Sequence, residues 1–171
     1  MTEETREKSR RMEIIEYIAL IVIAIMVTHG IQLGAKIILH VDTPFVVVAS
    51  GSMEPTLNVG DLLIVKGTDP NELHVGEIVI FKPPEPYWRG ILWVHRIIDI
   101  EANGDDIKIK TKGDANAFPD PFWLKSENII GAITTKIPYV GLLSLTMKKW
   151  SIPITILIAA IIILILILSK E

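Results

Sequence analysis

Two long apolar segments, one near each end of the chain, limit what it can fold into more than any other feature. The stronger segment runs from Ile152 to Leu168, carries no charge and consists largely of Ile and Leu. Each of these residues favours membrane insertion by roughly 0.3–0.6 kcal/mol. As a helix the segment rises about 25 Å, and its polar and aromatic neighbours extend it to a bilayer core of roughly 30 Å. We expect a transmembrane helix over residues 150–169.

The first apolar segment, from Tyr17 to Ala35, contains no Asp, Glu, Lys or Arg, although His29 and Gln32 make its distal end more polar. It predicts another transmembrane helix, over residues 14–36. A cleavable signal peptide is the alternative interpretation. The run is long for one, however, and no small-residue cleavage site clearly follows it.

Basic residues before the first apolar segment predict how the chain is oriented. Positive charges flanking a span stay in the cytoplasm, and here they are Arg6, Lys8, Arg10 and Arg11. Lys148 and Lys149 oppose this arrangement weakly, against Lys170. We expect a two-pass protein with residues 1–13 and the C-terminus in the cytoplasm and residues 37–149 outside it.

Composition excludes several classes of function. The mean hydropathy of +0.44 argues against an ordinary soluble domain, and a net charge of −3 provides no broad basic surface for nucleic acid. The absence of cysteine excludes disulfides, a thiol nucleophile and Cys-ligated metal. The four histidines are scattered without a His-x-x-x-His pair, so we expect neither a metal nor an organic cofactor.

The region between the apolar segments has the pattern of a small antiparallel β domain. Its apolar runs are short, rich in Val and Ile, and separated by Gly, Pro and Asp. Asn103-Gly104 is a tight-turn signal that predicts a hairpin between two of these runs. The expected strands are Phe45–Ala49, Leu62–Val65, Glu77–Phe81, Ile91–Ile100, Ile107–Thr111 and Ile129–Thr134.

A serine-containing turn follows the first expected strand, at residues 50–57. Gly51 permits a tight bend, and Pro55 restrains Glu54 to extended geometry. The turn therefore holds Ser52 stiffly. Most Ser-Gly-Ser turns are only turns, because a serine hydroxyl becomes a nucleophile only beside a base.

Three further residues could complete such a site. His95 lies within an expected strand, 43 residues beyond Ser52, which is far enough for the chain to fold back. A lone strand histidine is more often a structural residue. Asp114 and Asp120 lie in the segment 112–121, where Asp114 ends a strand and an aspartate commonly caps a turn.

Taken together, these segments resemble signal peptidase I, in the archaeal and endoplasmic-reticulum branch that uses Ser and His. Residues 50–56 match the family's Ser-Gly-Ser-Met-x-Pro-Thr box throughout, and residues 60–65 resemble the box that follows. Residues 94–97 resemble a box that has His in this branch and Lys in the bacterial one. Residues 112–114 resemble the final box, although Ala115 stands where an asparagine is usual. The resemblance covers roughly residues 45 to 121 and the preceding anchor.

The resemblance implies a role for each candidate residue. Ser52 would be the nucleophile, His95 its general base, and Asp120 the carboxylate that orients the imidazole. Asp114 competes for the last role; if Asp120 fills it, Asp114 would support the site structurally or electrostatically. The Ser52 backbone N–H and the Ser50 hydroxyl would stabilise the oxyanion.

The resemblance also implies a fold and a function. The fold would be mainly β, a small antiparallel β domain flanked by two transmembrane helices. The protein would be a membrane-bound serine endopeptidase that cuts signal peptides from secretory preproteins after small residues, as at Ala-x-Ala. The strand Phe45–Ala49 could pair with the extended substrate. Partners would be preproteins, the lipid bilayer and possible other membrane subunits, and the composition favours an archaeal plasma membrane over an endoplasmic reticulum.

Other interpretations remain open. The aromatic side chains of Trp88, Trp93, Phe118, Phe122 and Trp123 could anchor the domain at the membrane interface or equally fill its core. A Ser-Lys mechanism would need a buried lysine, with Lys66, Lys82 or Lys112 as candidates. A non-catalytic membrane scaffold whose β domain binds partners is the alternative of a different class.

Overall fold

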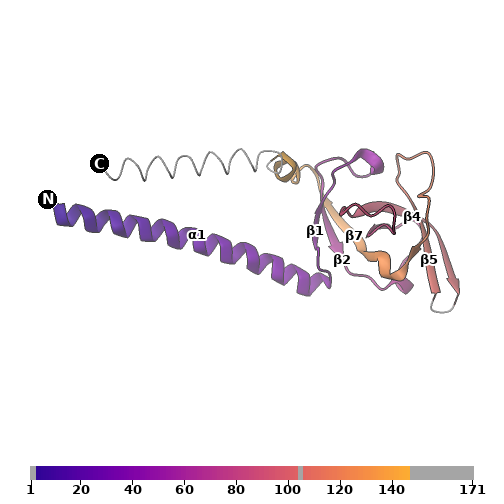
Figure 1. Ribbon diagram of the computed structural model, residues 1–171, viewed down its shortest axis with the longest axis horizontal. Coiled ribbons are helices and arrows are strands. Elements are labelled where there is room, and N and C mark those ends of the chain that lie inside the picture. Colours follow the sequence, from indigo (N-terminus) through magenta and orange to yellow (C-terminus); the bar gives the residue numbers. More distant parts are fainter. Residues whose placement is uncertain (1–2, 104–105, 147–171) are drawn as a thin grey trace. The chain divides into compact units, whose positions relative to one another are not determined.

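The computed structural model describes residues 3–103 and 106–146 (Figure 1). The chain divides into two units with the boundary between Pro44 and Phe45, and each unit is described by itself. The expected transmembrane helix over residues 150–169 lies outside the described residues.

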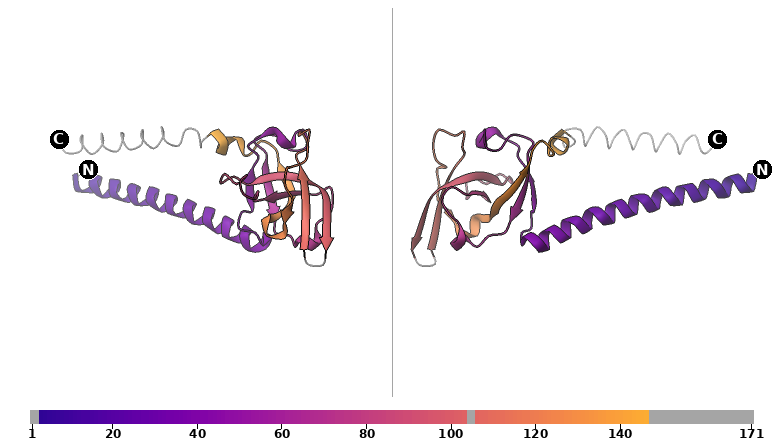
Figure 2. Two further views of the ribbon diagram at one scale, coloured as in Figure 1. Left: turned by 45° about the vertical axis from the view of Figure 1, so that its right-hand side comes forward. Right: turned by 180° about the vertical axis from the view of Figure 1, so that it is seen from behind.

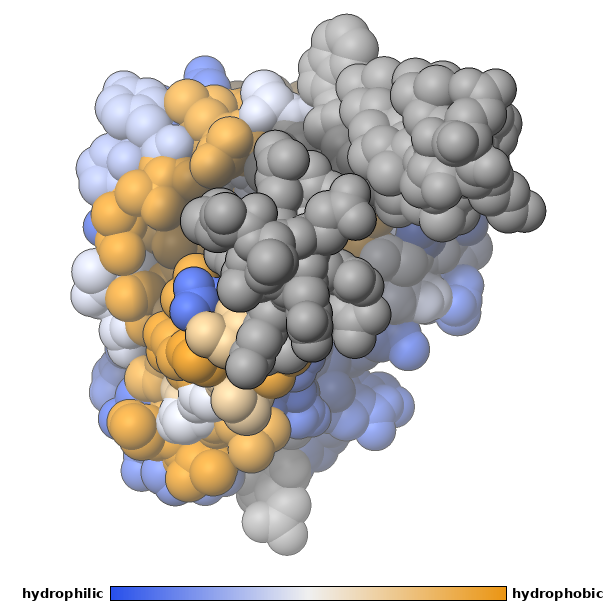
Figure 3. Space-filling view, turned by 90° about the vertical axis from the view of Figure 1, so that its left-hand side faces the viewer, coloured by the Kyte–Doolittle hydropathy of each residue, from blue (hydrophilic) through white to orange (hydrophobic). Residues whose placement is uncertain are grey.

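The first unit is one long helix, α1 (Glu3–Leu39). Its part from Glu16 to Leu39 contains an 18-residue stretch with a mean hydropathy of 2.1 and is long and apolar enough to cross a membrane. Thr28 Oγ1 and His29 Nδ1 lie 2.8 and 3.0 Å from the carbonyl oxygens four residues earlier, so each has a hydrogen-bond partner within the helix. Many of its large apolar side chains are exposed. Apolar residues, in orange, lie mainly on the left of the space-filling view in Figure 3. A helix over the first apolar segment is therefore confirmed.

The second unit contains a seven-stranded sheet in which every neighbouring pair is antiparallel. The sheet is strongly twisted, as the two views of Figure 2 show. Its strand order is β1-β2-β7-β3-β4-β5-β6. The strands are β1 (Phe45–Val47), β2 (Leu62–Lys66), β3 (Ile78–Phe81), β4 (Trp93–Asn103), β5 (Asp106–Lys112), β6 (Leu124–Lys125) and β7 (Ile129–Ile137).

The sheet confirms the mainly β prediction, and the differences concern strand ends and one short strand. β4 and β5 form the expected hairpin, with Asn103 paired to Asp106; residue 104 of the predicted turn lies outside the described residues. Burial alternates along β5 as the sequence predicts, with the apolar positions and Thr111 inside. The strand β6 is missing from the sequence prediction, because two residues are too few to show a period of two.

Two apolar clusters stabilise the sheet and fix the position of the candidate site. The first lies beneath β3, β4 and β5, where Phe81 and Ile97 are fully buried. Complete burial of a side chain of that size contributes about 1.5–3 kcal/mol. The second cluster includes Met53 and Leu57 from the segment after β1, together with Leu63 of β2. The serine turn is thus attached to the core by the side chains that follow Ser52.

Candidate active site

Ser52 lies in a short 3₁₀ turn, Gly51–Met53, directly after β1. The extended backbone at Ser50 and Glu54 brackets the turn, which agrees with the restraint expected from Pro55. The side chain of Met53 is 1% exposed, and its carbonyl oxygen accepts a hydrogen bond from the Leu57 N–H at 2.9 Å. Burial of one neighbour therefore fixes the turn while Ser52 itself stays partly accessible.

β4 brings His95 to the serine turn. His95 Nε2 lies 3.2 Å from Ser52 Oγ, at hydrogen-bonding distance. The imidazole is buried, with the rings of Phe81 and Trp93 centred 6.1 and 5.6 Å away. This packing limits rotation of the imidazole and keeps Nε2 directed at the serine hydroxyl. In the tautomer with the proton on Nδ1, Nε2 accepts the hydrogen bond that the Ser52 hydroxyl donates.

Asp120 lies on the other side of the imidazole. Its Oδ2 atom is 2.8 Å from His95 Nδ1 and 2.6 Å from Thr111 Oγ1, which donates to it. The Asp120 N–H also donates to the Thr111 carbonyl oxygen at 2.9 Å. Both side chains are buried. A strand residue that the sequence analysis does not single out, Thr111, thus fixes the carboxylate through backbone and side chain.

Asp114 has a different partner. Arg96 Nε and Nη2 donate to its two carboxylate oxygens at 2.9 and 2.6 Å, a bidentate pair of hydrogen bonds. These bonds hold the pKa of the Asp114 carboxyl below the 3.8 of an ordinary aspartate, against the opposing effect of burial. The two aspartates that compete in the sequence are therefore separated in the structure: Asp120 contacts His95, and Asp114 contacts Arg96.

The turn that contains Asp114 also holds the backbone of the serine. The Ala115 N–H donates to the Ser52 carbonyl oxygen at 2.9 Å, and the Asn116 N–H closes the turn on the Gly113 carbonyl at 3.0 Å. A Cβ atom on Gly113 would lie 2.6 Å from the same Ser52 oxygen. The site requires glycine there because the two backbones approach too closely for any side chain.

The other residues singled out in the sequence lie as follows. Ser50 Oγ is 3.4 Å from Ser52 Oγ, so the two hydroxyls face the same space. In the described part of the chain, the basic group hydrogen-bonded to Ser52 is His95 and not a lysine. Lys66 and Lys82 are exposed, and Lys112 stands opposite Arg96 in the register of β4 and β5.

The five aromatic side chains singled out in the sequence lie in three kinds of surroundings. Trp93 and Phe122 pack against the first apolar cluster, with their ring centres 5.7 Å apart. Trp88 and Trp123 each lie near a lysine ammonium group, and Phe118 is 81% exposed. Core packing thus accounts for two of the five, while Phe118 remains available for a contact outside the domain.

The arrangement can perform one kind of chemistry directly. A hydroxyl, an imidazole and a carboxylate follow one another at hydrogen-bonding distance, in the order in which serine hydrolases use them. Among the residues that the structure describes, no group of three or more His, Asp and Glu is placed to hold a metal ion.

Comparison with known proteins places the chain in a family. Residues 14–115 match the family described as signal peptidase, peptidase S26. The human and dog signal peptidase complex catalytic subunits SEC11C are each 36% identical over 125 residues, covering 68% of this chain and 64% of the relative. The SEC11 subunit of Fusarium vanettenii is 33% identical over 124 residues, covering 68% and 70%. The chain therefore belongs to the peptidase S26 signal peptidase family, as its motifs indicated.

The matches cover part of the chain and part of the relatives. The chain spans about 64% of the length of the mammalian relatives. The family match ends at Ala115, so Ser52, His95 and Asp114 lie inside it and Asp120 lies beyond it. The position of Asp120 is known from the fold alone.

Proposed function

We propose that the chain is a membrane-bound serine endopeptidase that removes signal peptides from secretory preproteins. The observation that carries this proposal is the hydrogen-bonded series Ser52–His95–Asp120 on the fold of a signal peptidase family member. Membership of the family supports the reaction class, and the series supplies the groups that this reaction needs.

In the proposed mechanism Ser52 Oγ attacks the carbonyl carbon of the scissile peptide bond and its proton passes to His95 Nε2. Asp120 stabilises the resulting imidazolium through Nδ1. The imidazolium then gives its proton to the departing amine, which leaves an ester between Ser52 and the signal peptide. In the second half of the reaction His95 removes a proton from water and the resulting hydroxide attacks the ester carbonyl carbon. The bond to Ser52 Oγ then breaks, the signal peptide leaves with a free carboxyl group, and the imidazolium returns its proton to Ser52 Oγ.

The developing oxyanion needs donors already in place. The Ser52 N–H and the Ser50 hydroxyl are the proposed donors, and the 3.4 Å between the two serine hydroxyls supports the second of them. Loss of one such donor typically costs about 10²–10³ in kcat. Ser50 would then contribute to the rate without being the nucleophile.

The substrate would bind as an added strand. β1 (Phe45–Val47) lies at one edge of the sheet and immediately precedes the serine turn. An extended peptide pairing with this edge would present alternate side chains to the protein and bring its scissile bond to Ser52. We propose small residues at positions −1 and −3 relative to the cut, as at Ala-x-Ala.

The proposed setting is a membrane. Residues 14–36 of α1 (Glu3–Leu39) would span the bilayer, with residues 1–13 in the cytoplasm and the catalytic domain of residues 37–149 outside it. Residues 150–169 would return as a second span. A signal peptide lies in the same bilayer, so anchoring raises its effective concentration at the site without new contacts. We propose a plasma-membrane location. We also propose other membrane subunits as partners, since the relatives are named as subunits of a complex.

The test of the substrate class is cleavage of a preprotein by the purified full chain in detergent. Two preproteins would be compared, one with Ala and one with a bulky Phe at position −1, and the new N-terminus would be sequenced. We expect a single cut after the alanine and at least a 100-fold slower cut beside phenylalanine. Equal rates would contradict the small-residue specificity, and an inert wild-type protein would favour the scaffold interpretation.

A further inference from the structure

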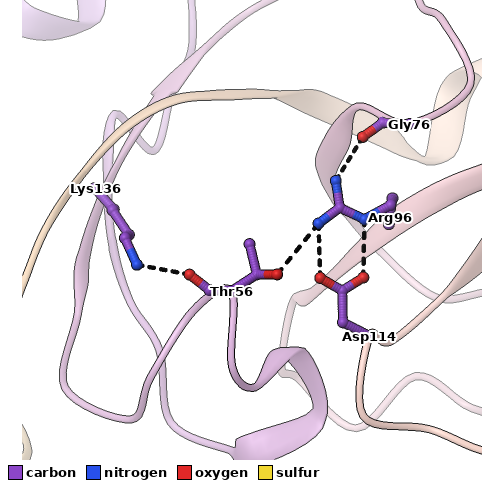
Figure 4. A network of polar contacts seen from close by, with 5 residues as sticks. All are labelled: Thr56, Gly76, Arg96, Asp114 and Lys136. Atoms are coloured by element: carbon purple, nitrogen blue, oxygen red, sulfur yellow. Dashed lines mark hydrogen bonds and ion pairs between the residues drawn. The ribbon is translucent and has the colours of Figure 1, made fainter.

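Arg96 follows His95 on β4 and therefore faces the opposite side of the sheet. Its guanidinium contacts three separate segments (Figure 4). It forms the paired bonds with Asp114, donates through Nη1 to the Gly76 carbonyl at 2.7 Å, and reaches Thr56 Oγ1 through Nη2 at 3.4 Å. One side chain thus links the serine turn (residues 50–57), the segment before β3 and the turn after β5.

Two of these contacts lead to Ser52. Asp114 immediately precedes Ala115, whose N–H holds the Ser52 carbonyl oxygen at 2.9 Å. Thr56 lies four residues beyond Ser52 in the same loop, and its carbonyl oxygen also accepts a hydrogen bond from Lys136 Nζ at 2.6 Å. Arg96 therefore contacts both segments around the nucleophile: the serine turn through Thr56, and the turn that is hydrogen-bonded to the Ser52 backbone through Asp114.

The side chain of Arg96 suits this task by its chemistry. Its planar fork of N–H donors can bind both oxygens of one carboxylate and still reach a carbonyl oxygen and a hydroxyl. The Arg96 side chain is 32% exposed and its partner carboxylate 16%, so the pair is partly shielded from water. Lysine has the same charge but only three N–H donors, too few for these four acceptors.

We propose that Arg96 is a positioning residue. By holding Thr56 and the Gly113–Asn116 turn in place, it keeps Ser52 Oγ at hydrogen-bonding distance from His95 Nε2. β4 then supplies the general base on one face and the brace for the nucleophile on the other. The proposal rests on the peptidase function proposed above and gives Asp114 a supporting role that needs no contact with His95.

The experiment measures kcat and KM for preprotein cleavage by the full chain with Arg96→Met, Arg96→Lys and Asp114→Asn. A displacement of about 1 Å can cost about 100-fold in rate, so we expect Arg96→Met to lower kcat about 100-fold with KM changed less than threefold. Arg96→Lys should recover only part of the loss. Arg89→Met is the matched control, because Arg89 is exposed in another loop, and it should leave kcat unchanged.

Hydrogen exchange provides a readout that does not depend on activity. The Ala115 amide should exchange at least tenfold faster in Arg96→Met and in Asp114→Asn than in the wild type, and as slowly as the wild type in Arg89→Met. The double variant Arg96→Met, Asp114→Asn should lose little more kcat than either single variant, because both changes release the same turn.

The outcomes separate the inference from the function on which it rests. Wild-type kcat in Arg96→Met, or unchanged exchange at Ala115, overturns the positioning role while cleavage by the wild type upholds the peptidase. If the wild type does not cleave, or Ser52→Ala cleaves equally well, the proposed peptidase function is wrong. The exchange rate of the Ala115 amide in Arg96→Met, compared with the wild type, still shows whether Arg96 holds the turn. If Arg96→Met does not fold, Asp114→Asn releases the turn from its other side and decides the question.

Discussion

Asp120 Oδ2 and His95 Nδ1 lie 2.8 Å apart in the buried part of the candidate site. This contact places the carboxylate on the ring nitrogen that faces away from Ser52, where it selects the tautomer that leaves Nε2 free to accept a proton. The sequence motifs alone leave Asp114 as a competitor for the same role. The structure pairs Asp114 with Arg96 instead.

Substitution by asparagine should therefore affect the reaction differently at Asp120 and at Asp114. Asp120→Asn should lower kcat by about 10³–10⁴-fold, because an amide at this place favours the wrong tautomer of His95. Asp114→Asn should lower it less, about 100-fold or below, since it acts only through position. Steady-state cleavage of one preprotein by both variants makes the comparison. A greater loss in Asp114→Asn would exchange the roles argued for the two residues.

Thr111 should prove necessary through its hydroxyl. Thr111→Val keeps the shape but removes the donor that lies 2.6 Å from Asp120, leaving a buried carboxylate with one partner fewer. We expect the free energy of unfolding to fall by about 1–3 kcal/mol and kcat to fall about tenfold. Thr111→Ser, which retains the hydroxyl, should stay within threefold of wild-type kcat. Denaturant unfolding together with cleavage kinetics measures both effects, and equal behaviour of the two variants would show that the hydroxyl is dispensable.

Gly113→Ala should displace the nucleophile. The added Cβ would lie 2.6 Å from the Ser52 carbonyl oxygen, so one of the two backbones must move. We expect at least a 100-fold loss of kcat. Gly90→Ala is the control, because Gly90 has a φ of 75° but open space around it, so alanine there strains the backbone without touching the site. A loss of activity shared by both variants would indicate general destabilisation and not displacement of Ser52.

The Arg96–Asp114 pair should make the free energy of unfolding depend on pH in the acidic range. The pKa of Asp114 is lower in the folded chain than the ordinary 3.8, so the folded state binds fewer protons there than the unfolded state. Its contribution is therefore present above about pH 5 and is lost as the pH falls through 3.8 toward the lower folded pKa. The free-energy difference between wild type and Asp114→Asn should be constant above about pH 5 and shrink below about pH 4. A difference that stays constant down to about pH 3 would contradict this.

The absence of cysteine permits a clean test of orientation. Thr5→Cys and Glu101→Cys place single thiols in the N-terminal segment and in the β4–β5 hairpin, and Glu101 is exposed. In intact cells an impermeant maleimide should label the second variant only, whereas lysed cells should show labelling of both. Labelling of Thr5→Cys alone in intact cells would invert the proposed topology.

Most of the sheet could be predicted because its strands obey a simple period. In β5 the apolar residues alternate with lysines, and the burial alternates with them. The two-residue strand β6 carries no such signal. β1 ends at Val47, earlier than expected, since the apolar run itself does not mark where the chain bends toward Ser50.

The candidate site could be predicted in part for a different reason. Ser52 and His95 lie in the motif segments 50–56 and 94–97, so each could be singled out without knowing its neighbours in the fold. Asp120 lies beyond the last of these segments, and the sequence left it in competition with Asp114. Thr111 and Arg96 contact residues 9 and 18 positions away, Asp120 and Asp114, which lie in the segment between β5 and β6, so a local sequence pattern does not reveal these contacts. One signal was available for Arg96: because side chains alternate along a strand, the neighbour of an inward His95 must face the other way.

The most direct test of the account is cleavage of an Ala-x-Ala preprotein by purified wild type and by Ser52→Ala, with Ser50→Ala alongside. The account predicts that Ser52→Ala loses at least about 10⁴-fold in kcat while retaining the wild-type unfolding transition. Ser50→Ala should lose about 10²–10³-fold, as expected for one oxyanion donor. Undiminished cleavage by Ser52→Ala, or a larger loss in Ser50→Ala, would contradict the claim that Ser52 is the nucleophile.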